Sequence, residues 1–378
     1  MNKPIFIHAE NVDEKTMNQF TSCASCDFVK AAALMPDAHL GYVAPVGAVL
    51  ITENYLVPAW VGYDIGCGVL AAKTNLSVED IMPYKNAIYS AVESNVPMGL
   101  GERNGHNDIS DQAKEAYEKI LDRFRSGPHN HNIMQFFEDS AIRHIGSLGS
   151  GNHFIELSTD TENNVWLVVH SGSRGVGYKV AKKYMERSAK SDDYEETHPI
   201  HDESTLGKEY KNILQFGLQF AELNREEMVR KTAQAISQEI GKEVTWSIWT
   251  NKNHNHALEE NGQYIHRKGA TPAKKGEKGV IPANMKEGSY LVEGKGADTF
   301  LQSSSHGAGR IMSRSGAKSN IDIEDFKSTM DGVVGTVSEK TLDEAPQAYK
   351  DISRVLELQK ESIEVKKHLK PLVNWKGT

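Results

Sequence analysis

The sequence predicts a single domain of the α+β class over residues 1–378. Short apolar runs bounded by glycine indicate strands, and two longer segments with apolar residues at helical spacing indicate helices. No repeat, low-complexity tract or long Pro/Ser linker divides the chain. With 39% hydrophobic and 25% charged residues, the 378-residue chain is long enough to bury a substantial core. We therefore expect one compact unit.

The predicted strands are short stretches of aliphatic and aromatic residues. They lie at residues 47–52, 153–157 and 165–170, next to glycine or polar turn residues. Glycine-rich backbone follows or precedes each of them, so their ends are the expected positions for binding and catalytic groups.

The predicted helices are residues 206–239 and residues 342–369, and the second ends near Pro371. In both segments apolar residues recur every three or four positions with charged residues between them, an amphipathic pattern that predicts core-facing helices. Residues 267–284 are rich in Lys, Gly and Pro, and this composition predicts a loop.

Composition restricts the class of protein. No run approaches the roughly 18 apolar residues of a membrane span, and residues 1–5 lack the layout of a secretory signal, so we expect a cytoplasmic protein without a membrane partner. Three cysteines give no disulfide framework, and the lone pair Cys23 and Cys26 is interpreted as structural. A net charge of −8 argues against a generally basic nucleic-acid-coating protein but not against an enzyme that holds phosphate locally.

The segment Val61-Gly-Tyr-Asp-Ile-Gly-Cys-Gly68 is the sharpest local motif. Its glycines let the backbone turn tightly, so that the carboxylate of Asp64 and the thiol of Cys67 can face one point. This donor pair suits a divalent metal such as Mn²⁺ or Zn²⁺, and a cysteine can bridge two metals. The alternative is a tight turn with an incidental buried cysteine.

Histidines extend the candidate site. His153 opens one predicted strand and His170 closes another, each beside glycine-rich backbone whose amides can receive phosphate oxygens. His254 and His256 alternate along the chain, so they face opposite sides of an extended segment and at most one is expected to be a ligand. Each histidine taken alone also has a structural interpretation.

His306 stands in the Ser/Gly-rich segment Gln302-Ser-Ser-Ser-His-Gly-Ala-Gly-Arg310. An imidazole there can act as a nucleophile towards a phosphoanhydride, with Arg310 and backbone amides holding the negative charge that develops. No G-x-x-x-x-G-K-[ST] loop occurs, which excludes an ordinary P-loop enzyme.

Taken together, these motifs resemble the RtcB family of RNA-splicing ligases and follow one another in the family's order. The motifs are Met35-Pro-Asp-Ala-His-Leu-Gly41, the Asp64 and Cys67 turn, Gly151-Asn-His153, His170-Ser-Gly-Ser-Arg174, His266-Arg-Lys-Gly-Ala-Thr271 and His306-Gly-Ala-Gly-Arg-Ile-Met-Ser-Arg314, with Lys376-Gly377 near the end.

The resemblance implies mixed and antiparallel sheets, packed by helices around a central site for two Mn²⁺ ions. It implies a ligase that uses GTP to join an RNA 3′-phosphate or 2′,3′-cyclic phosphate to a 5′-hydroxyl, in RNA repair or tRNA splicing. The compact length suggests a bacterial branch of the family. His306 is implied to attack the α-phosphorus of GTP and to carry GMP as a phosphoramidate, which then passes to the RNA 3′-phosphate before the 5′-hydroxyl displaces it.

The resemblance also assigns residues. Cys67 is implied to bridge the two metals, one completed by His153 and His170 and the other by Asp64 and His254; His254 is preferred over His256 because it directly precedes Asn255. Arg174, Arg310 and Arg314 are implied to bind RNA phosphates, although a surface or ion-paired role is the alternative. The implied nucleotide-binding residues are Asn152, Glu156, Asn255, Ala283, Asn284, Met285, Ser289, Gly307, Ala308, Gly309 and Lys376.

Two segments depart from the family's pattern. Its Pro-Gly-Ser-Met turn is Pro282-Ala-Asn-Met285 here, where the lost glycine restricts the turn while Asn284 keeps an amide for hydrogen bonding. Its Lys-Gly-Ala-Thr-Arg is Lys268-Gly-Ala-Thr-Pro272 here, which removes a cation from the expected RNA grip.

Two other functions remain open from the residues. A phosphoesterase or nuclease could use the same two-metal cluster to hydrolyse a cyclic phosphate or phosphodiester without GTP. A non-enzymatic RNA-associated factor could use the metal only to hold its fold.

Overall fold

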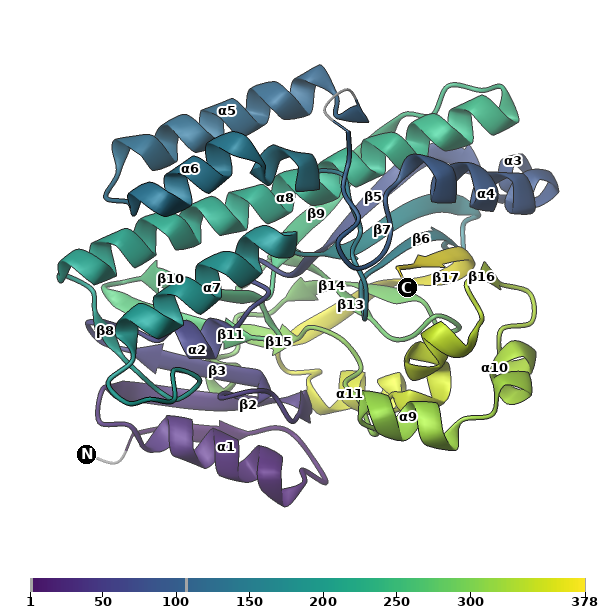
Figure 1. Ribbon diagram of the computed structural model, residues 1–378. Coiled ribbons are helices and arrows are strands. Elements are labelled where there is room, and N and C mark those ends of the chain that lie inside the picture. Colours follow the sequence, from purple (N-terminus) through teal and green to yellow (C-terminus); the bar gives the residue numbers. More distant parts are fainter. Residues whose placement is uncertain (1–2, 106–107, 378) are drawn as a thin grey trace.

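Two β-sheets form the frame of the protein, and helices pack on opposite sides of this frame, in the computed structural model of the chain (Figure 1). The structure describes residues 3–105 and 108–377; residues 1–2, 106–107 and 378 of the predicted domain lie outside the described residues. Strand pairs of both directions occur, parallel for β1 with β2 and antiparallel for most others. The α+β class predicted from the sequence is confirmed.

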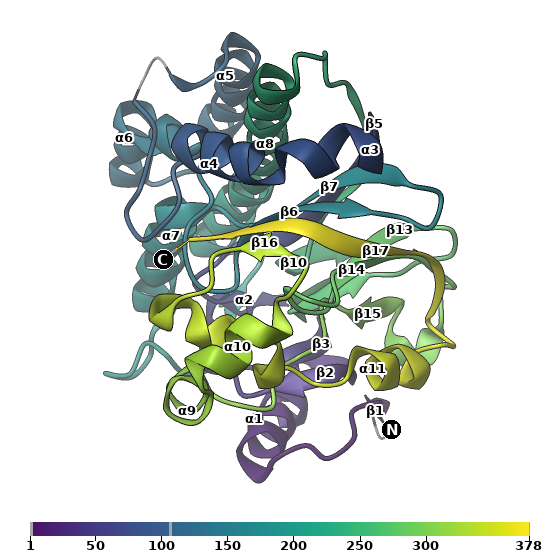
Figure 2. The ribbon, with the colours of Figure 1, turned by 90° about the vertical axis from the view of Figure 1, so that its right-hand side faces the viewer.

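The larger sheet has the order β13-β14-β17-β6-β7-β5-β9, with β16 also paired to β17. Its long strand β17 crosses the middle of the sheet and pairs with β14 on one side and β6 on the other (Figure 2). The predicted strands at 153–157 and 165–170 are confirmed as β6 and β7. The strands are β5 (Gly68–Ser77), β6 (Phe154–Thr159), β7 (Asn164–Ser171), β9 (Trp246–Asn253), β13 (Lys278–Pro282), β14 (Ser289–Gly294), β16 (Val334–Gly335) and β17 (Ile363–Lys376).

The smaller sheet has the order β1-β2-β3-β11-β10, and the predicted strand at 47–52 is confirmed as β3. Two short pairs, β12 with β15 and β4 with β8, complete the strands of the described residues. Their bounds are β1 (Ile5–Ile7), β2 (Val29–His39), β3 (Val46–Thr52), β4 (Tyr55–Leu56), β8 (Ile200–His201), β10 (Asn255–Glu260), β11 (Gln263–Lys268), β12 (Ala270–Pro272) and β15 (Ser303–Ser305).

The helix α8 (Thr205–Ile240) confirms the helix predicted at 206–239 and packs against β5, β7 and β9. Ser204 caps its start by accepting a hydrogen bond from the amide of Gly207, and Gly241 ends it in the left-handed conformation. The other α-helices are α1 (Glu14–Ser25), α2 (Pro58–Val61), α3 (Val78–Ile81), α4 (Lys85–Asn95), α5 (Asp111–Ser126), α6 (His131–Asp139), α7 (Arg174–Ser188), α9 (Arg314–Asn320), α10 (Ile323–Thr329) and α11 (Ile352–Leu358).

The helix predicted at 342–369 is wrong. Only α11 within it is α-helical, and the chain from Ile363 onwards is the strand β17. The apolar spacing of this stretch suits a helix, but β14 and β6 offer it backbone partners on both sides, and tertiary pairing overrides a local pattern. Pro371 lies at a register shift against β6, where the regular hydrogen-bond pattern is already interrupted, so its missing N–H donor is tolerated.

The loop predicted at 267–284 is wrong for most of its length. Its Lys/Gly/Pro composition conceals the end of β11, all of β12 and all of β13, where Val280 and Ile281 are buried and paired with β14. Within this predicted loop, only Gly269 and residues 273–277 and 283–284 lie outside the strands.

Two expectations from composition also have structural outcomes. No helix in the described residues is long and apolar enough to cross a membrane. Cys23 is buried within α1 and Cys26 follows it half-buried, both as free thiols, and neither belongs to the groups of candidate metal ligands found among the described residues. This agrees with a structural role for the pair.

Candidate metal centre and nucleotide pocket

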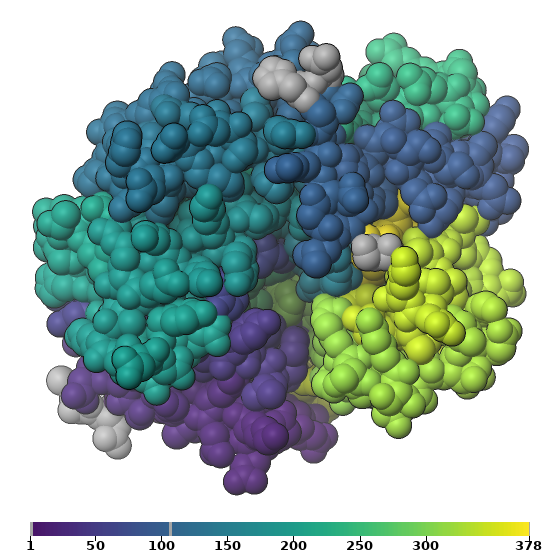
Figure 3. Space-filling view, viewed as in Figure 1, coloured from purple at the N-terminus to yellow at the C-terminus, as the bar shows by residue number. Residues whose placement is uncertain are grey.

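A cavity of about 590 Å³ opens between the two sheets, and Figure 3 shows it as a hollow in the middle of one face. Segments far apart in the sequence line it, from Asp13 at the start of α1 to Lys376 at the end of β17. Of the site residues expected from the sequence, His153, Ser289 and Arg174 stand outside the lining. The others contribute to it: Asp64, Cys67, Asn152, Glu156, His170, His254, Asn255, Ala283, Asn284, Met285, His306, Gly307, Ala308, Gly309, Arg310, Arg314 and Lys376.

Cys67, His170 and His254 form the first ligand group, with one possible ligand atom from each residue within 4.8 Å of the others. The Sγ atom of Cys67 lies 3.3 Å from Nε2 of His170, which lies 3.4 Å from Nε2 of His254. All three side chains are buried. His256, two residues after His254, takes no part in the group, so only one of the two alternating histidines faces it.

Asp64, Cys67 and His153 form the second ligand group. Nε2 of His153 lies 3.0 Å from Oδ2 of Asp64 and 3.5 Å from Sγ of Cys67. Cys67 thus belongs to both groups, as expected of a bridging ligand. By proximity His153 lies with Asp64 and His170 lies with His254, each pair beside Cys67. The assignment of His153 and His170 to one metal and of Asp64 and His254 to the other stays a prediction. Strand order brings His170 and His254 beside Cys67. His170 is the last residue but one of β7, His254 follows β9, and β5, which Cys67 precedes, pairs with both strands.

Backbone carbonyls orient the imidazoles. Nδ1 of His153 lies 3.1 Å from the carbonyl of Leu148, and Nδ1 of His170 lies 3.2 Å from that of Asn152. A carbonyl only accepts, so Nδ1 carries the proton and Nε2 presents its lone pair to the cluster. Burial lowers the pKa of His170 and of His254 well below the ordinary value, which keeps both rings neutral. Neutral imidazoles with a thiol and a carboxylate are a donor set suited to Mn²⁺ or Zn²⁺.

His306 is held by a buried carboxylate that the sequence analysis did not single out. Oδ2 of Asp37 lies 2.7 Å from Nδ1 of His306 and accepts from the amides of His306 and Gly307 at 3.1 and 3.3 Å. Burial raises the pKa of Asp37, but the charge and hydrogen bond of His306 outweigh it, so the pKa stays below its ordinary value. Asp37 lies within the Pro-Asp-Ala-His motif quoted above, and that motif was the signal that could have found it.

Glycine is required at 309, beside this pair. The residue has φ of +79°, and a Cβ atom there would lie 2.3 Å from the carbonyl oxygen of Asp37. The Gly-Ala-Gly turn therefore lets the segment after His306 pass directly over the strand that carries its partner.

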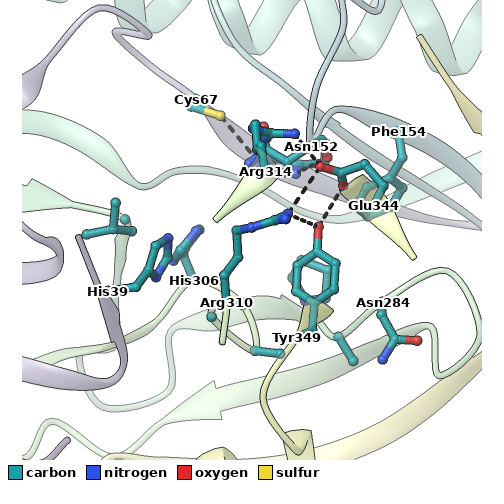
Figure 4. Close-up of a pocket in the computed structure, with 18 of the residues that line it drawn as sticks. His39, Cys67, Asn152, Phe154, Asn284, His306, Arg310, Arg314, Glu344 and Tyr349 are labelled. Carbon is teal, nitrogen blue, oxygen red and sulfur yellow. Dashed lines mark hydrogen bonds and ion pairs between the residues drawn. The ribbon is translucent and has the colours of Figure 1, made fainter. Parts of the chain in front are cut away.

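The far end of the cavity holds a buried charge network around Glu344 (Figure 4). Its carboxylate accepts from Nζ of Lys376 and from the hydroxyl of Tyr349, both at 2.6 Å. Arg314 also pairs with it at 2.6 Å and Arg310 at 3.4 Å. Burial raises the pKa of Glu344, but the charges of Lys376 and Arg314 lower it to about 2. The Glu344 carboxylate thus partly neutralises Arg310 and Arg314, two of the three arginines expected to bind RNA.

Glu156 and Arg174 have different surroundings. Glu156 is 1% exposed and accepts from Ser158 at 2.6 Å and from Asn374 at 3.0 Å. Burial raises its pKa to about 7 against those hydrogen bonds. Arg174 begins α7 close to Asp64, and its buried Nε atom has no hydrogen-bond partner in the described residues.

Comparison with known proteins decides the family. The family model described as "tRNA-splicing ligase RtcB" matches residues 19–377. The chain is 32% identical to the "RNA-splicing ligase RtcB" of Escherichia coli K12, over 97% of this chain and 95% of that protein. The chain belongs to the RtcB family. It is also 29% identical to the "tRNA-splicing ligase RtcB" of Nanoarchaeum equitans, over 96% of this chain and 92% of that protein. A eukaryotic relative, the "RNA-splicing ligase RtcB homolog 1" of Entamoeba dispar, is 27% identical over 96% of this chain and 82% of that protein.

The departures from the RtcB pattern have clear local structures. Oδ1 of Asn284 accepts from the amides of Lys286 and Glu287 at 3.0 and 2.9 Å, so the asparagine closes its own turn without the family's glycine. Pro272 ends β12 opposite Ser303, where a proline is tolerated at the edge of a two-stranded pair. The side chain of Asn255 donates a hydrogen bond to the carbonyl of Asp64 and accepts one from the amide of Gly269. These bonds connect the loop that carries Asp64 to the residue just before β12.

Proposed function

We propose that the chain is an RNA ligase that uses GTP to join an RNA 3′-phosphate or 2′,3′-cyclic phosphate to a 5′-hydroxyl, in RNA repair or tRNA splicing. The printed names of the relatives support RNA ligation. The observation that carries the mechanism is the pairing of His306 with Asp37 on the wall of the cavity that also holds the ligand cluster.

His306 is the proposed nucleophile. Nδ1–H of His306 donates a hydrogen bond to the Asp37 carboxylate, so the proton stays on Nδ1 and the lone pair of Nε2 is free to attack the α-phosphorus of GTP. A nitrogen–phosphorus bond forms, the bond to the bridging oxygen breaks, and pyrophosphate leaves. The imidazole becomes cationic as it reacts, and the Asp37 carboxylate stabilises that charge. A 2′,3′-cyclic phosphate end is first hydrolysed by water to the 3′-phosphate. The RNA 3′-phosphate then takes the guanylate from His306, and the 5′-hydroxyl displaces GMP.

The two ligand groups are the proposed binding site for two Mn²⁺ ions. Asp64, Cys67, His153, His170 and His254 offer convergent carboxylate, thiol and imidazole atoms, and all three imidazoles are buried from solvent. Metal ions bound there would neutralise phosphate charge and polarise phosphorus–oxygen bonds.

The nucleotide is proposed to lie between His306 and the end of β17. Glu156 and Lys376 face this part of the cavity, and a carboxylate that accepts from the N1 and N2 donors of guanine excludes adenine. The Gly307, Ala308 and Gly309 backbone lies beside His306 and can approach phosphate oxygens closely. Arg174, Arg310 and Arg314 are the proposed RNA contacts, and the last two line the cavity.

The test is a ligation assay with two RNA oligonucleotides, one ending in a 2′,3′-cyclic phosphate and one beginning with a 5′-hydroxyl. We expect a joined product that requires both GTP and Mn²⁺, and no product from His306→Ala. His131→Ala, which removes an exposed histidine of α6, is the matched control and should ligate normally. Hydrolysis of the cyclic phosphate without GTP and without joining would instead identify a phosphoesterase.

A further inference from the structure

Arg225 is a fully buried arginine in the middle of α8, and its guanidinium makes four hydrogen bonds. Nη1 donates to the carbonyls of Gly66 and Ser171 at 3.0 and 2.8 Å. Nη2 donates to Oδ1 of Asn253, and Nε donates to Oδ1 of Asn251, both at 2.7 Å. All four acceptors are neutral oxygen atoms, so the bonds fix positions rather than pair charges.

Three of these acceptors directly adjoin the first ligand group. Gly66 directly precedes Cys67, Ser171 directly follows His170, and Asn253 directly precedes His254. One rigid, planar group therefore joins the three chain segments that carry the group, and these segments come from separate parts of the sequence. A guanidinium suits this task because its donors are held in a fixed fork.

Asn224, the preceding residue of α8, holds the loop that leads to His153 in a similar way. Oδ1 of Asn224 accepts from the amides of Gly146 and Ser147 at 2.8 and 3.1 Å, and its Nδ2 donates to the carbonyl of Gly172 at 3.0 Å. The loop it holds continues to His153 of the second ligand group. Neither Asn224 nor Arg225 lines the cavity, so both act from behind it.

We propose that Arg225 is a positioning residue that sets the spacing of Cys67, His170 and His254, and thereby the metal affinity and coordination geometry of the centre. The proposal rests on the proposed metal centre. Polar partners behind metal ligands commonly control metal affinity by roughly 10–100-fold.

The experiment is Co²⁺ titration of the full-length, metal-free chain, followed by the visible and thiolate-to-metal absorption bands. We expect Arg225→Met to weaken Co²⁺ binding by roughly 10–100-fold and to change the visible spectrum. Arg225→Lys keeps the charge but loses the planar set of donors, so we expect its Co²⁺ affinity and spectrum to change as those of Arg225→Met do. Wild-type affinity and spectrum in either variant would overturn the proposal.

Arg230→Met is the matched control on the same helix, because among the described residues the Arg230 side chain donates only to Glu227 and Gln234, both within α8. It should keep the wild-type spectrum, and an equal change there would mean that any loosening of α8 disturbs the site. If both Arg225 variants fail to fold, Asn253→Ala removes one arm of the fork and should still shift the spectrum; no shift would overturn the proposal. A wild-type chain that binds no Co²⁺ would instead refute the proposed metal centre.

Discussion

Nδ1 of His306 lies 2.7 Å from Oδ2 of Asp37, although 269 positions separate the two residues in the chain. The contact exists because β15, which precedes His306, lies beside β2, which carries Asp37. The same carboxylate oxygen accepts two backbone amides, so the pair is fixed by both side chain and main chain. In the proposed reaction, Asp37 therefore sets which imidazole nitrogen attacks.

Asp37→Asn should slow transfer of GMP to the protein by roughly 100- to 10,000-fold, the range expected when a positioned acid–base partner is lost. The amide cannot stabilise the cationic imidazole and can hold it in the wrong tautomer. The measurement is the rate at which α-labelled GTP labels the chain in Mn²⁺. Far-UV circular dichroism and GTP affinity should stay close to wild type, and labelling at the wild-type rate would refute the role of Asp37.

His254 and His256 provide a matched pair for the metal centre. We expect His254→Ala to lose measurable binding of one Mn²⁺ ion, because it removes a ligand of the first group. His256 is 1% exposed, and neither of its ring nitrogens has a partner in the described residues. His256→Leu should therefore keep Mn²⁺ binding and change the free energy of unfolding by no more than about 1 kcal/mol, or increase it. Isothermal titration calorimetry and urea unfolding measure the two effects; loss of Mn²⁺ in His256→Leu would contradict this assignment.

Glu156 should make GTP binding depend on pH. Its pKa is raised to about 7, and only the ionised carboxylate accepts from guanine N1 and N2. GTP affinity should thus fall as pH decreases through 7, by up to roughly tenfold per pH unit below it. Titration calorimetry at pH 6 and pH 8 measures the change. In Glu156→Gln, binding should be weak at both pH values, with only the small difference caused by the GTP phosphates; an unchanged pH dependence would exclude Glu156 as the cause.

Glu344 should stabilise the fold above pH 4.5 and lose that effect in acid. Its pKa of about 2 lies below the ordinary value, so its contribution is complete above the unfolded-state pKa and disappears as pH falls towards 2. Glu344→Gln leaves Lys376 and Arg314 without their buried anion, which should cost about 3 kcal/mol of unfolding free energy at pH 7. Urea unfolding from pH 7 to pH 3 should show the gap between wild type and variant narrowing below pH 4.5. A gap that stays constant would contradict the ionised state of Glu344.

Elements with a strong local signal could be predicted from the sequence. Residues 206–239 form a helix because their amphipathic pattern, serine cap and terminal glycine all agree. β17 could not be predicted, because its apolar spacing also suits a helix and its partners, β14 and β6, are fixed only by the tertiary fold. Residues 278–282 were predicted as loop for a related reason. Their Lys, Gly and Pro residues are typical of loops, and only two apolar residues among them indicate a strand.

The candidate site was predicted by residue type but not by arrangement. Glycine-flanked motifs and family resemblance pointed to five donor residues that the fold brings together, while the proximity of His153 to Asp64 depends on tertiary structure that no local motif records. Asp37, Arg225 and Glu344 act through contacts with residues distant in the chain, so their roles become visible only when the fold brings those residues together.

The most direct test of the account is to identify the residue that carries GMP. The chain is incubated with GTP and Mn²⁺, digested under neutral conditions, and its peptides are analysed by mass spectrometry. We predict an acid-labile guanylate on His306, absent from His306→Ala. A guanylate on a lysine or another histidine, or RNA joining that proceeds without any protein-bound guanylate, would contradict the account.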